Sequence, residues 1–246
     1  MTEEQGQGSG RDDELRAIRA TYDEYRRAGR DRIWDPQNRG YAAIFRDRNA
    51  ALVAALRDAL PSLGGRVLDL GCGDGGLAGI ARDAGLPIGS WIGVDLDPVS
   101  IREAALEHDR AQFIEGSADD LPFEDGAFDV VVASMLFSSL PTWDFERRVA
   151  LEITRVLSLS GTLVWYDLRR SNPANRAVHA MTRRRIAELF PAWKAELRAV
   201  TLIPPLARRL GPLTGIAYPL LHSVGFLRSH LVGILRRGAG DSPPAG

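Results

Sequence analysis

Between residues 66 and 168, short apolar runs alternate with segments of helical periodicity. Apolar runs at 66–70, 90–96, 111–116, 128–136 and 161–168 predict five strands, and residues 77–84, 99–108 and 145–157 between them predict helices. Strands that are apolar nearly throughout and joined by helices are typical of a parallel sheet covered on both faces. The pattern therefore predicts an α/β fold with a doubly wound, mostly parallel sheet.

The pattern differs on both sides of this region. Residues 11–30 and 42–60 predict helices, joined by a turn-rich connector over 34–41. Beyond residue 168 we expect a helix over 177–189 and two strands, 196–203 and 229–235. These strands flank an apolar segment, 204–227, which Pro and Gly interrupt. No run of 18 apolar residues occurs, so the sequence predicts no membrane-spanning helix.

These patterns divide the 246 residues into a few expected segments. Residues 1–10 and 238–246 are polar and rich in Gly or Pro, so we expect disordered tails. Residues 11–63 are expected to form an N-terminal helical segment, and 64–237 a single domain that includes the insertion 204–227. No apolar stretch follows the N-terminus, so we expect no signal peptide and a cytoplasmic location.

Charge is distributed unevenly, although the net charge is only −1. Residues 168–237 hold thirteen basic and two acidic residues, which indicates an anionic partner: a phosphate, carboxylate, acidic carrier protein, nucleic acid or membrane surface. A solvated arginine-rich face is the alternative. The single cysteine, Cys72, excludes an internal disulfide and a Cys-based zinc site. No His, Asp and Glu cluster has metal-ligand spacing, so we predict no metal.

The most informative stretch is V-L-D-L-G-C-G-D-G-G, residues 67–76. Here a predicted strand runs into closely spaced glycines and then a helix, an arrangement in which backbone N–H groups approach a ligand closely. Gly71, Gly73 and Gly76 also satisfy the G-x-G-x-x-G pattern of dinucleotide-binding proteins, with Asp95 at a suitable distance. An NAD-dependent dehydrogenase is therefore an alternative. Against it, Asp69 places a carboxylate where a cationic amino acid fits better than a pyrophosphate.

Two further stretches, G-V-D-L-D-P at 93–98 and G-S-A-D-D-L-P-F-E-D-G-A-F-D-V-V-V at 116–132, follow that loop in order. Together the three closely resemble the successive motifs of class I S-adenosylmethionine (SAM)-dependent methyltransferases. The likeness covers roughly residues 64–168. It is to the branch with ubiquinone/menaquinone, natural-product and sugar methyltransferases. The resemblance implies a Rossmann-like fold in which the two late strands form a terminal antiparallel pair and residues 11–63 form a lid over the cofactor. It also implies SAM as cofactor and a biosynthetic methylation.

The resemblance also implies which residues hold the cofactor. Asp69 and the loop residues Gly71, Cys72 and Gly73 would surround the methionine moiety. Asp95 would accept hydrogen bonds from both ribose hydroxyls, and Leu96 would lie against the adenine. The Ala118 backbone would meet an adenine nitrogen, and Ser134 and Met135 would close the site.

Three positions depart from the family pattern. Ser117 stands where the family usually has Asp, so a hydroxyl, or Asp119, must serve the adenine amino group. Ser138 and Ser139 stand where many relatives have His. The segment 157–161 replaces the usual Leu-x-Pro-Gly-Gly turn before the fifth predicted strand.

Methyl transfer is an in-line displacement that depends mainly on orientation, sometimes with a general base. Tyr166 and Asp167, at the carboxyl end of the fifth predicted strand, and His230 are the catalytic candidates; Asp167 could instead cap or pair locally with Arg169 or Arg170. Arg169 could bind an anionic group of the acceptor. Tyr25 and Trp34 would contact the substrate if the N-terminal helix is a lid; a packing helix is the alternative.

These observations predict a SAM-dependent methyltransferase acting on a hydroxyl, or less readily on N or C, of a small metabolite. The acceptor would be a sugar or natural-product intermediate, anionic or carrier-linked. An RNA methyltransferase is the alternative enzyme, motivated by the basic C-terminal third. A SAM-binding protein without catalysis is a third reading. Contact of the apolar insertion with an anionic membrane surface is a further hypothesis.

Overall fold

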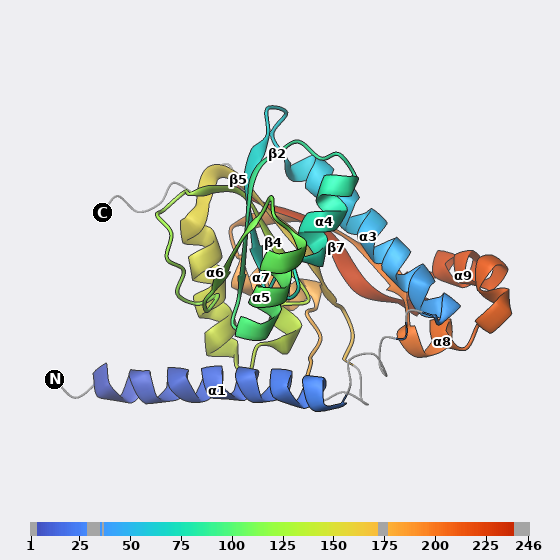
Figure 1. Ribbon diagram of the computed structural model, residues 1–246, viewed down its shortest axis with the longest axis horizontal. Coiled ribbons are helices and arrows are strands. Elements are labelled where there is room, and N and C mark those ends of the chain that lie inside the picture. Colours follow the sequence, from blue (N-terminus) through green and yellow to red (C-terminus); the bar gives the residue numbers. More distant parts are fainter. Residues whose placement is uncertain (1–3, 29–34, 36, 172–176, 239–246) are drawn as a thin grey trace.

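The structure is a computed structural model that describes residues 4–28, 35, 37–171 and 177–238 (Figure 1). A seven-stranded sheet has the order β3-β2-β1-β4-β5-β7-β6. The strands are β1 (Gly65–Leu70), β2 (Ile88–Asp95), β3 (Gln112–Glu115), β4 (Phe128–Ser134), β5 (Leu157–Leu168), β6 (Trp193–Leu202) and β7 (Arg228–Arg237). The first five are parallel, whereas β7 runs antiparallel to both β5 and β6. The predicted α/β fold with an antiparallel C-terminal strand is confirmed.

Helices cover both faces of the sheet. On one face, α3 (Arg39–Ala59) and α4 (Gly76–Asp83) pack on Val67 and its neighbours on that side. On the other, α6 (Trp143–Val156) and α7 (Arg183–Leu189) pack on Leu68 and Leu70. The helix α5 (Pro98–Glu107) lies between β2 and β3 in the chain. Because side chains alternate along a strand, Asp69 points toward the face of α3 and α4.

Two predicted element boundaries are wrong. The first helix, α1 (Glu4–Ala28), begins at Glu4 inside the predicted tail, because extending a formed helix costs far less than starting one. The helix predicted over 177–189 begins only at Arg183. The N–H groups of His179 and Met181 instead donate to the carbonyls of Ser138 and Leu168, at 2.9 and 2.7 Å, which holds that backbone in a non-helical path.

The segment 157–161 was predicted to form a turn, and the structure differs here too. It forms the first residues of β5, and the pairing register between β4 and β5 shifts there, between Phe128 and Val130. The irregular pairing accommodates residues that do not continue the regular ladder.

The apolar insertion forms two short helices, α8 (Pro204–Arg208) and α9 (Thr214–Ser223), with 3₁₀ turns η2 (Gly211–Leu213) and η3 (Gly225–Leu227). A third turn, η1 (Phe137–Ser139), follows β4. Both helices project from the body beside the start of α3 (Figure 1). A small core of Tyr41, Ile44, Leu202, Ala207 and Tyr218 joins them to α3 and β6. Among the described residues, no helix has the length and apolar character needed to span a bilayer.

Candidate functional site

The glycine loop between β1 and α4 folds through three residues in the left-handed region. Gly71, Gly73 and Gly75 have φ of 70°, 55° and 74°, values that a side chain disfavours. The N–H groups of Gly71 and Cys72 both donate to the carbonyl of Val94 in β2, at 2.8 and 3.2 Å. The loop is therefore fastened to the neighbouring strand while the helix start of α4 faces the carboxyl edge of the sheet.

Asp95, the last residue of β2, fastens the loop a second time. Its carboxylate accepts from the Gly73 N–H at 2.8 Å and from the Asp97 N–H at 2.9 Å. Burial raises the pKa of Asp95, and these backbone donors oppose that rise. Each carboxylate oxygen has a second lone-pair direction, so Asp95 can still accept from a vicinal diol.

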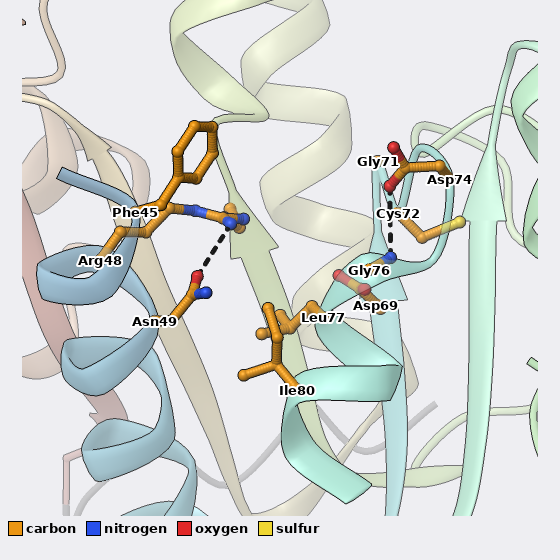
Figure 2. Close-up of a pocket in the computed structure, with 11 residues that line it drawn as sticks. Phe45, Arg48, Asn49, Asp69, Gly71, Cys72, Asp74, Gly76, Leu77 and Ile80 are labelled. Carbon is orange, nitrogen blue, oxygen red and sulfur yellow. Dashed lines mark hydrogen bonds between the residues drawn. The ribbon is translucent and has the colours of Figure 1, made fainter. Parts of the chain in front are cut away.

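A cavity of about 250 Å³ opens between α3 and α4, over the ends of β1 and β4 (Figure 2). It brings together Asp69, Gly71, Cys72 and Ser134 from the predicted set. Burial raises the pKa of the Cys72 thiol, so this cysteine is a wall of the cavity and not a nucleophile. Leu96, Ser117 and Ala118 lie outside the lining, partly exposed at the ends of β2 and β3.

Asp69 is the unusual group in this cavity. It is only 2% exposed, and within the described part of the chain its Oδ2 atom has no hydrogen-bond partner. Burial raises its pKa to about 7, while Arg48 lowers it and Asp95 and Asp74 raise it further. A buried carboxylate oxygen without a donor is costly, so the site fits a ligand that brings a cationic donor. The ammonium group of an amino-acid moiety has this chemistry.

Arg48 supplies the opposite charge, and sequence reasoning missed it. Its guanidinium donates to Ser134 Oγ and to Asn49 Oδ1, both at 3.3 Å, and lies 5.8 Å from the centre of the Tyr166 ring. A signal was present: Arg48 stands four residues after Ile44 and four before Leu52, on the apolar stripe of α3. Arg48 and Asp69 together can receive the two charged ends of an amino acid.

The end of β4 is strained where it meets the cavity. Met135 has a φ of 60°, which is rare for a non-glycine residue, and its N–H donates to the Tyr166 carbonyl at 2.7 Å. Such strain persists only where the surroundings enforce it, and it is concentrated at functional sites. Ser134 lines the cavity, and the strained Met135 follows it directly.

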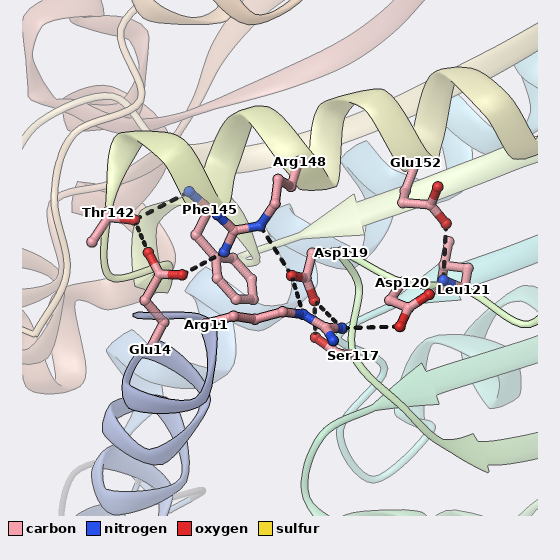
Figure 3. A network of polar contacts seen from close by, with 10 residues as sticks. All are labelled: Arg11, Glu14, Ser117, Asp119, Asp120, Leu121, Thr142, Phe145, Arg148 and Glu152. Atoms are coloured by element: carbon pink, nitrogen blue, oxygen red, sulfur yellow. Dashed lines mark hydrogen bonds and ion pairs between the residues drawn. The ribbon is translucent and has the colours of Figure 1, made fainter. Parts of the chain in front are cut away.

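Beyond β3, Asp119 forms the centre of a polar network (Figure 3). Arg11 of α1 donates to both carboxylate oxygens at 2.9 and 3.2 Å, Arg148 of α6 at 3.2 Å, and Ser117 Oγ at 2.5 Å. Although burial raises the pKa of Asp119, these donors lower it overall. Asp119 is thus occupied by protein donors, whereas the Ser117 oxygen keeps lone pairs for an adenine amino group.

The helix α1 crosses the loops that follow β2 and β3. Besides Arg11, it pairs Arg26 with Asp97 at 2.5 Å and Arg19 with Glu115 at 3.5 Å, and Glu14 contacts Arg148 and Thr142. The contacts of α1 thus reach the ends of both strands, where the resemblance places the adenosine. Two residues were predicted to contact the substrate, Tyr25 and Trp34. Trp34 and the side chain of Tyr25 lie outside the described part of the chain.

Two of the catalytic candidates form a stacked pair on the α3 face. The ring centres of Tyr166 and His230 lie 4.9 Å apart, and the two ring planes are inclined by 11°. Tyr166 Oη lies 3.0 Å from Thr201 Oγ1. His230 Nδ1 lies 2.9 Å from Ser229 Oγ. Burial raises the pKa of Tyr166 and lowers that of His230 to about 3, so His230 is neutral at physiological pH.

Asp167 lies on the opposite face of the sheet, because neighbouring residues of a strand point to opposite sides. It accepts from the backbone N–H groups of Ser138 and Leu168, at 3.0 and 2.7 Å, and burial raises its pKa to about 6. Within the described residues it makes no ion pair with Arg169, which donates to the Gly225 carbonyl at 3.3 Å. The structure therefore separates Asp167 from Tyr166 and His230.

Comparison with known proteins identifies the class of this domain. A family model described as "Methyltransferase domain" matches residues 68–165. Residues 68–165 thus form a methyltransferase domain, SAM is the cofactor that the comparisons support, and the unsatisfied Asp69 beside the glycine loop fits that ligand. In the described residues no group of His, Cys, Asp and Glu is arranged to hold a metal ion.

Two curated proteins are similar to this chain in sequence, and one solved structure is similar in fold. The chain is 37% identical over 114 residues to a phthiotriol/phenolphthiotriol dimycocerosates methyltransferase of Mycobacterium leprae, covering 44% of this chain and 40% of that protein. The chain is also 31% identical over 179 residues to the protein of the same name from Mycobacterium tuberculosis. This match covers 71% of this chain and 59% of that protein. The fold resembles that of geranyl diphosphate C-methyltransferase of Streptomyces coelicolor, with a TM-score of 0.58 and 20% sequence identity. The superposition covers 76% of this chain and 77% of that chain.

Proposed function

We propose that this protein transfers the methyl group of SAM to a hydroxyl group of a small, lipid-like molecule. The observation that carries the proposal is the buried carboxylate of Asp69, whose Oδ2 has no partner within the described residues and which lines the cavity beside the glycine loop. The chain spans 40% and 59% of the two mycobacterial relatives, so their activity enters here only as support.

The residues of the cavity have complementary tasks toward the cofactor. Asp69 pairs with its ammonium group, and Arg48, on the facing helix, pairs with its carboxylate. Asp95 accepts from the ribose hydroxyls at the end of β2, and Ser117 accepts from the adenine amino group. Each charge-assisted hydrogen bond of this kind contributes about 1.5–3 kcal/mol.

Three features support a lipid-like hydroxyl acceptor. Both mycobacterial relatives are named for phthiotriol and phenolphthiotriol dimycocerosates, and this chain carries an apolar insertion beside α3. After β4 it has Ser134-Met135-Leu136-Phe137 in place of the N-P-P-Y-type tetrapeptide that marks amino-nitrogen methyltransferases.

SAM supplies an electrophilic methyl group when it is bound. The protein's part is then to fix the acceptor oxygen in line with it, where orientation alone contributes up to about 7–11 kcal/mol. Asp167 is held by backbone donors on the far face, and His230 is buried against Tyr166. Catalysis in this proposal therefore depends on positioning: the hydroxyl proton passes to solvent, and His230, whose pKa burial lowers to about 3, is not required as a base.

The test is transfer of label from methyl-labelled SAM to a panel of acceptors: long-chain diols, simple sugars, and a short RNA. We expect label in an organic extract of the diol reaction, with mass spectrometry placing the methyl group on oxygen. Label in RNA alone would support the alternative enzyme. Binding of S-adenosylhomocysteine without transfer to any acceptor would support a non-catalytic SAM-binding protein.

A further inference from the structure

The helix α9 has an apolar outer face. It contains no charged Asp, Glu, Lys or Arg, and its inner face, with Thr214 and Tyr218, is buried against the body. A surface helix normally turns polar residues outward. Here Ile216 is 74% and Leu220 is 66% exposed, and Leu213 and Phe226 are similarly exposed on the adjoining turns. We call these four residues the apolar tip.

The apolar tip is held rigidly in place. On its inner side, Asp47 of α3 lies 3.4 Å from Tyr218 Oη and 3.2 Å from His222 Nε2, and it accepts from the Thr201 N–H at 2.8 Å. Gly40 lets the α8 backbone approach α3 so closely that an added Cβ would lie 2.0 Å from the Ala207 carbonyl oxygen. The exposed side chains are therefore a fixed feature of the surface and do not belong to a loosely attached segment.

Arginines without carboxylate partners gather beside the apolar tip. Arg169 donates to the Gly225 carbonyl of η3, and Arg228 to the carbonyls of His222 and Ser223 at the end of α9. The pKa of Arg169 is lowered by burial and by repulsion from Arg170, Arg183 and Arg228. Within the described residues, none of these four arginines forms an ion pair, and the sequence has no Asp or Glu between Glu196 and Asp241.

We propose that the apolar tip and the arginine cluster dock the protein on an anionic phospholipid bilayer. The leucine, isoleucine and phenylalanine side chains enter the boundary between headgroups and acyl chains, and the arginines meet the lipid phosphates. Arg169 and Arg170 follow the end of β5, so docking brings the carboxyl edge of the sheet toward the membrane. This inference goes beyond the proposed function and does not depend on it.

Charge favours a bilayer over a second copy of the chain. In a symmetric dimer the same patch occurs on both partners, so a dimer formed through this patch would bring two arginine clusters close together. An anionic bilayer instead offers a negative surface and an apolar layer at adjoining depths, which match the cluster and the apolar tip. An RNA would meet the arginines but leave the exposed Ile216 and Leu220 in water.

The first experiment is flotation of the full chain with phosphatidylcholine vesicles, with or without phosphatidylglycerol, over a salt series. We expect binding to the anionic vesicles only, weakening as salt rises. Arg170→Gln should lower the affinity about five-fold. Equal binding to both vesicle types, or no binding to either, would overturn the proposal.

The second experiment tests the apolar tip. Ile216→Ser with Leu220→Ser should weaken vesicle binding by about ten-fold or more, while Leu106→Ser with Leu151→Ser should not. The control leucines, on α5 and α6, are 87% and 66% exposed. Unchanged thermal unfolding and S-adenosylhomocysteine binding show that each variant is folded. Vesicle binding that survives the loss of the tip, or a wild-type dimer that the tip variant breaks, would contradict bilayer docking.

A third readout reports insertion directly. Because Cys72 is buried, a polarity-sensitive thiol dye labels an introduced Ile216→Cys selectively. Its emission should shift to the blue when phosphatidylglycerol vesicles are added, and the emission of dye on Leu106→Cys should not. Identical responses at the two positions would show that the apolar tip does not enter the bilayer.

Discussion

Buried polar groups are treated differently at the two ends of the sheet's carboxyl edge. At the ends of β1 and β2, Asp69 keeps a carboxylate oxygen without a partner within the described residues, and Asp95 binds backbone while keeping lone pairs. At the end of β5 and the start of β7, Asp167 binds backbone donors and Tyr166 contacts Thr201 and His230. The comparison indicates that the first end is built to receive a charged ligand, whereas the second is largely satisfied by the protein itself.

The largest effect should come from removing the charge of Asp69. Asp69→Asn keeps the size of the side chain but loses the ion pair with the ligand's ammonium group, so S-adenosylhomocysteine affinity should fall about ten- to a hundred-fold. Calorimetry measures this. Asp83→Asn, which changes an exposed carboxylate at the end of α4 outside the cavity lining, is the control with a small expected change. Equal affinity in Asp69→Asn and wild type would remove the distinction between the two ends.

The same substitution should change stability in the opposite direction. In the ligand-free protein the pKa of Asp69 is about 7, above its value in an unfolded chain, so the folded state binds the extra proton. Its contribution to the free energy of unfolding is therefore lost as pH rises from about 4 to 7. Asp69→Asn should be more stable than wild type at pH 8, as measured by denaturant unfolding.

The next largest effect should come from Gly40, which attaches the insertion to α3. Gly40→Ala forces the α8 backbone away and should lower the free energy of unfolding by about 1–3 kcal/mol. Gly215→Ala, where an added Cβ meets nothing within 4 Å, should be neutral or slightly stabilising. Chemical denaturation compares the two variants, and a similar loss in both would argue against close packing at Gly40.

A smaller effect is expected from the ion pairs of α1. Arg11→Gln with Arg26→Gln removes the bonds to Asp119 and Asp97, and ion pairs of partly exposed arginines each contribute little. S-adenosylhomocysteine should therefore dissociate a few-fold faster, with less hydrogen-exchange protection in α1. Arg16→Gln, which pairs only within α1, is the control. Unchanged dissociation in the double variant would indicate a packing helix and not a lid.

The smallest effect is expected at His230. Its folded-state pKa of about 3 lies below that of an unfolded chain, so its contribution to stability is lost as pH falls from about 6.5 toward 3. His230→Gln should keep methyl transfer within a few-fold between pH 6 and 8 and unfold less readily in acid. A hundred-fold loss of transfer, with normal S-adenosylhomocysteine binding, would instead identify His230 as the general base.

The sequence also predicted the two ends of the carboxyl edge to different extents. The glycine loop, Asp95 and the five parallel strands follow from local patterns: apolar runs, glycine spacing and a carboxylate at a strand end. Arg48 was missed because its role depends on how α3 packs over β4, although its place on an apolar stripe was a signal. The separation of Asp167 from Tyr166 follows from strand alternation. The Arg11–Asp119 contact joins residues 108 positions apart, which no local pattern could predict.

The most direct measurement is the proton balance of SAM binding, obtained by calorimetry at pH 6 in buffers of different ionisation enthalpy. If Asp69 receives the ammonium group, the bound state favours its ionised form, so binding should release a proton. The release should disappear in Asp69→Asn. Binding without proton release, and equally tight in the wild type and in Asp69→Asn, would contradict the account.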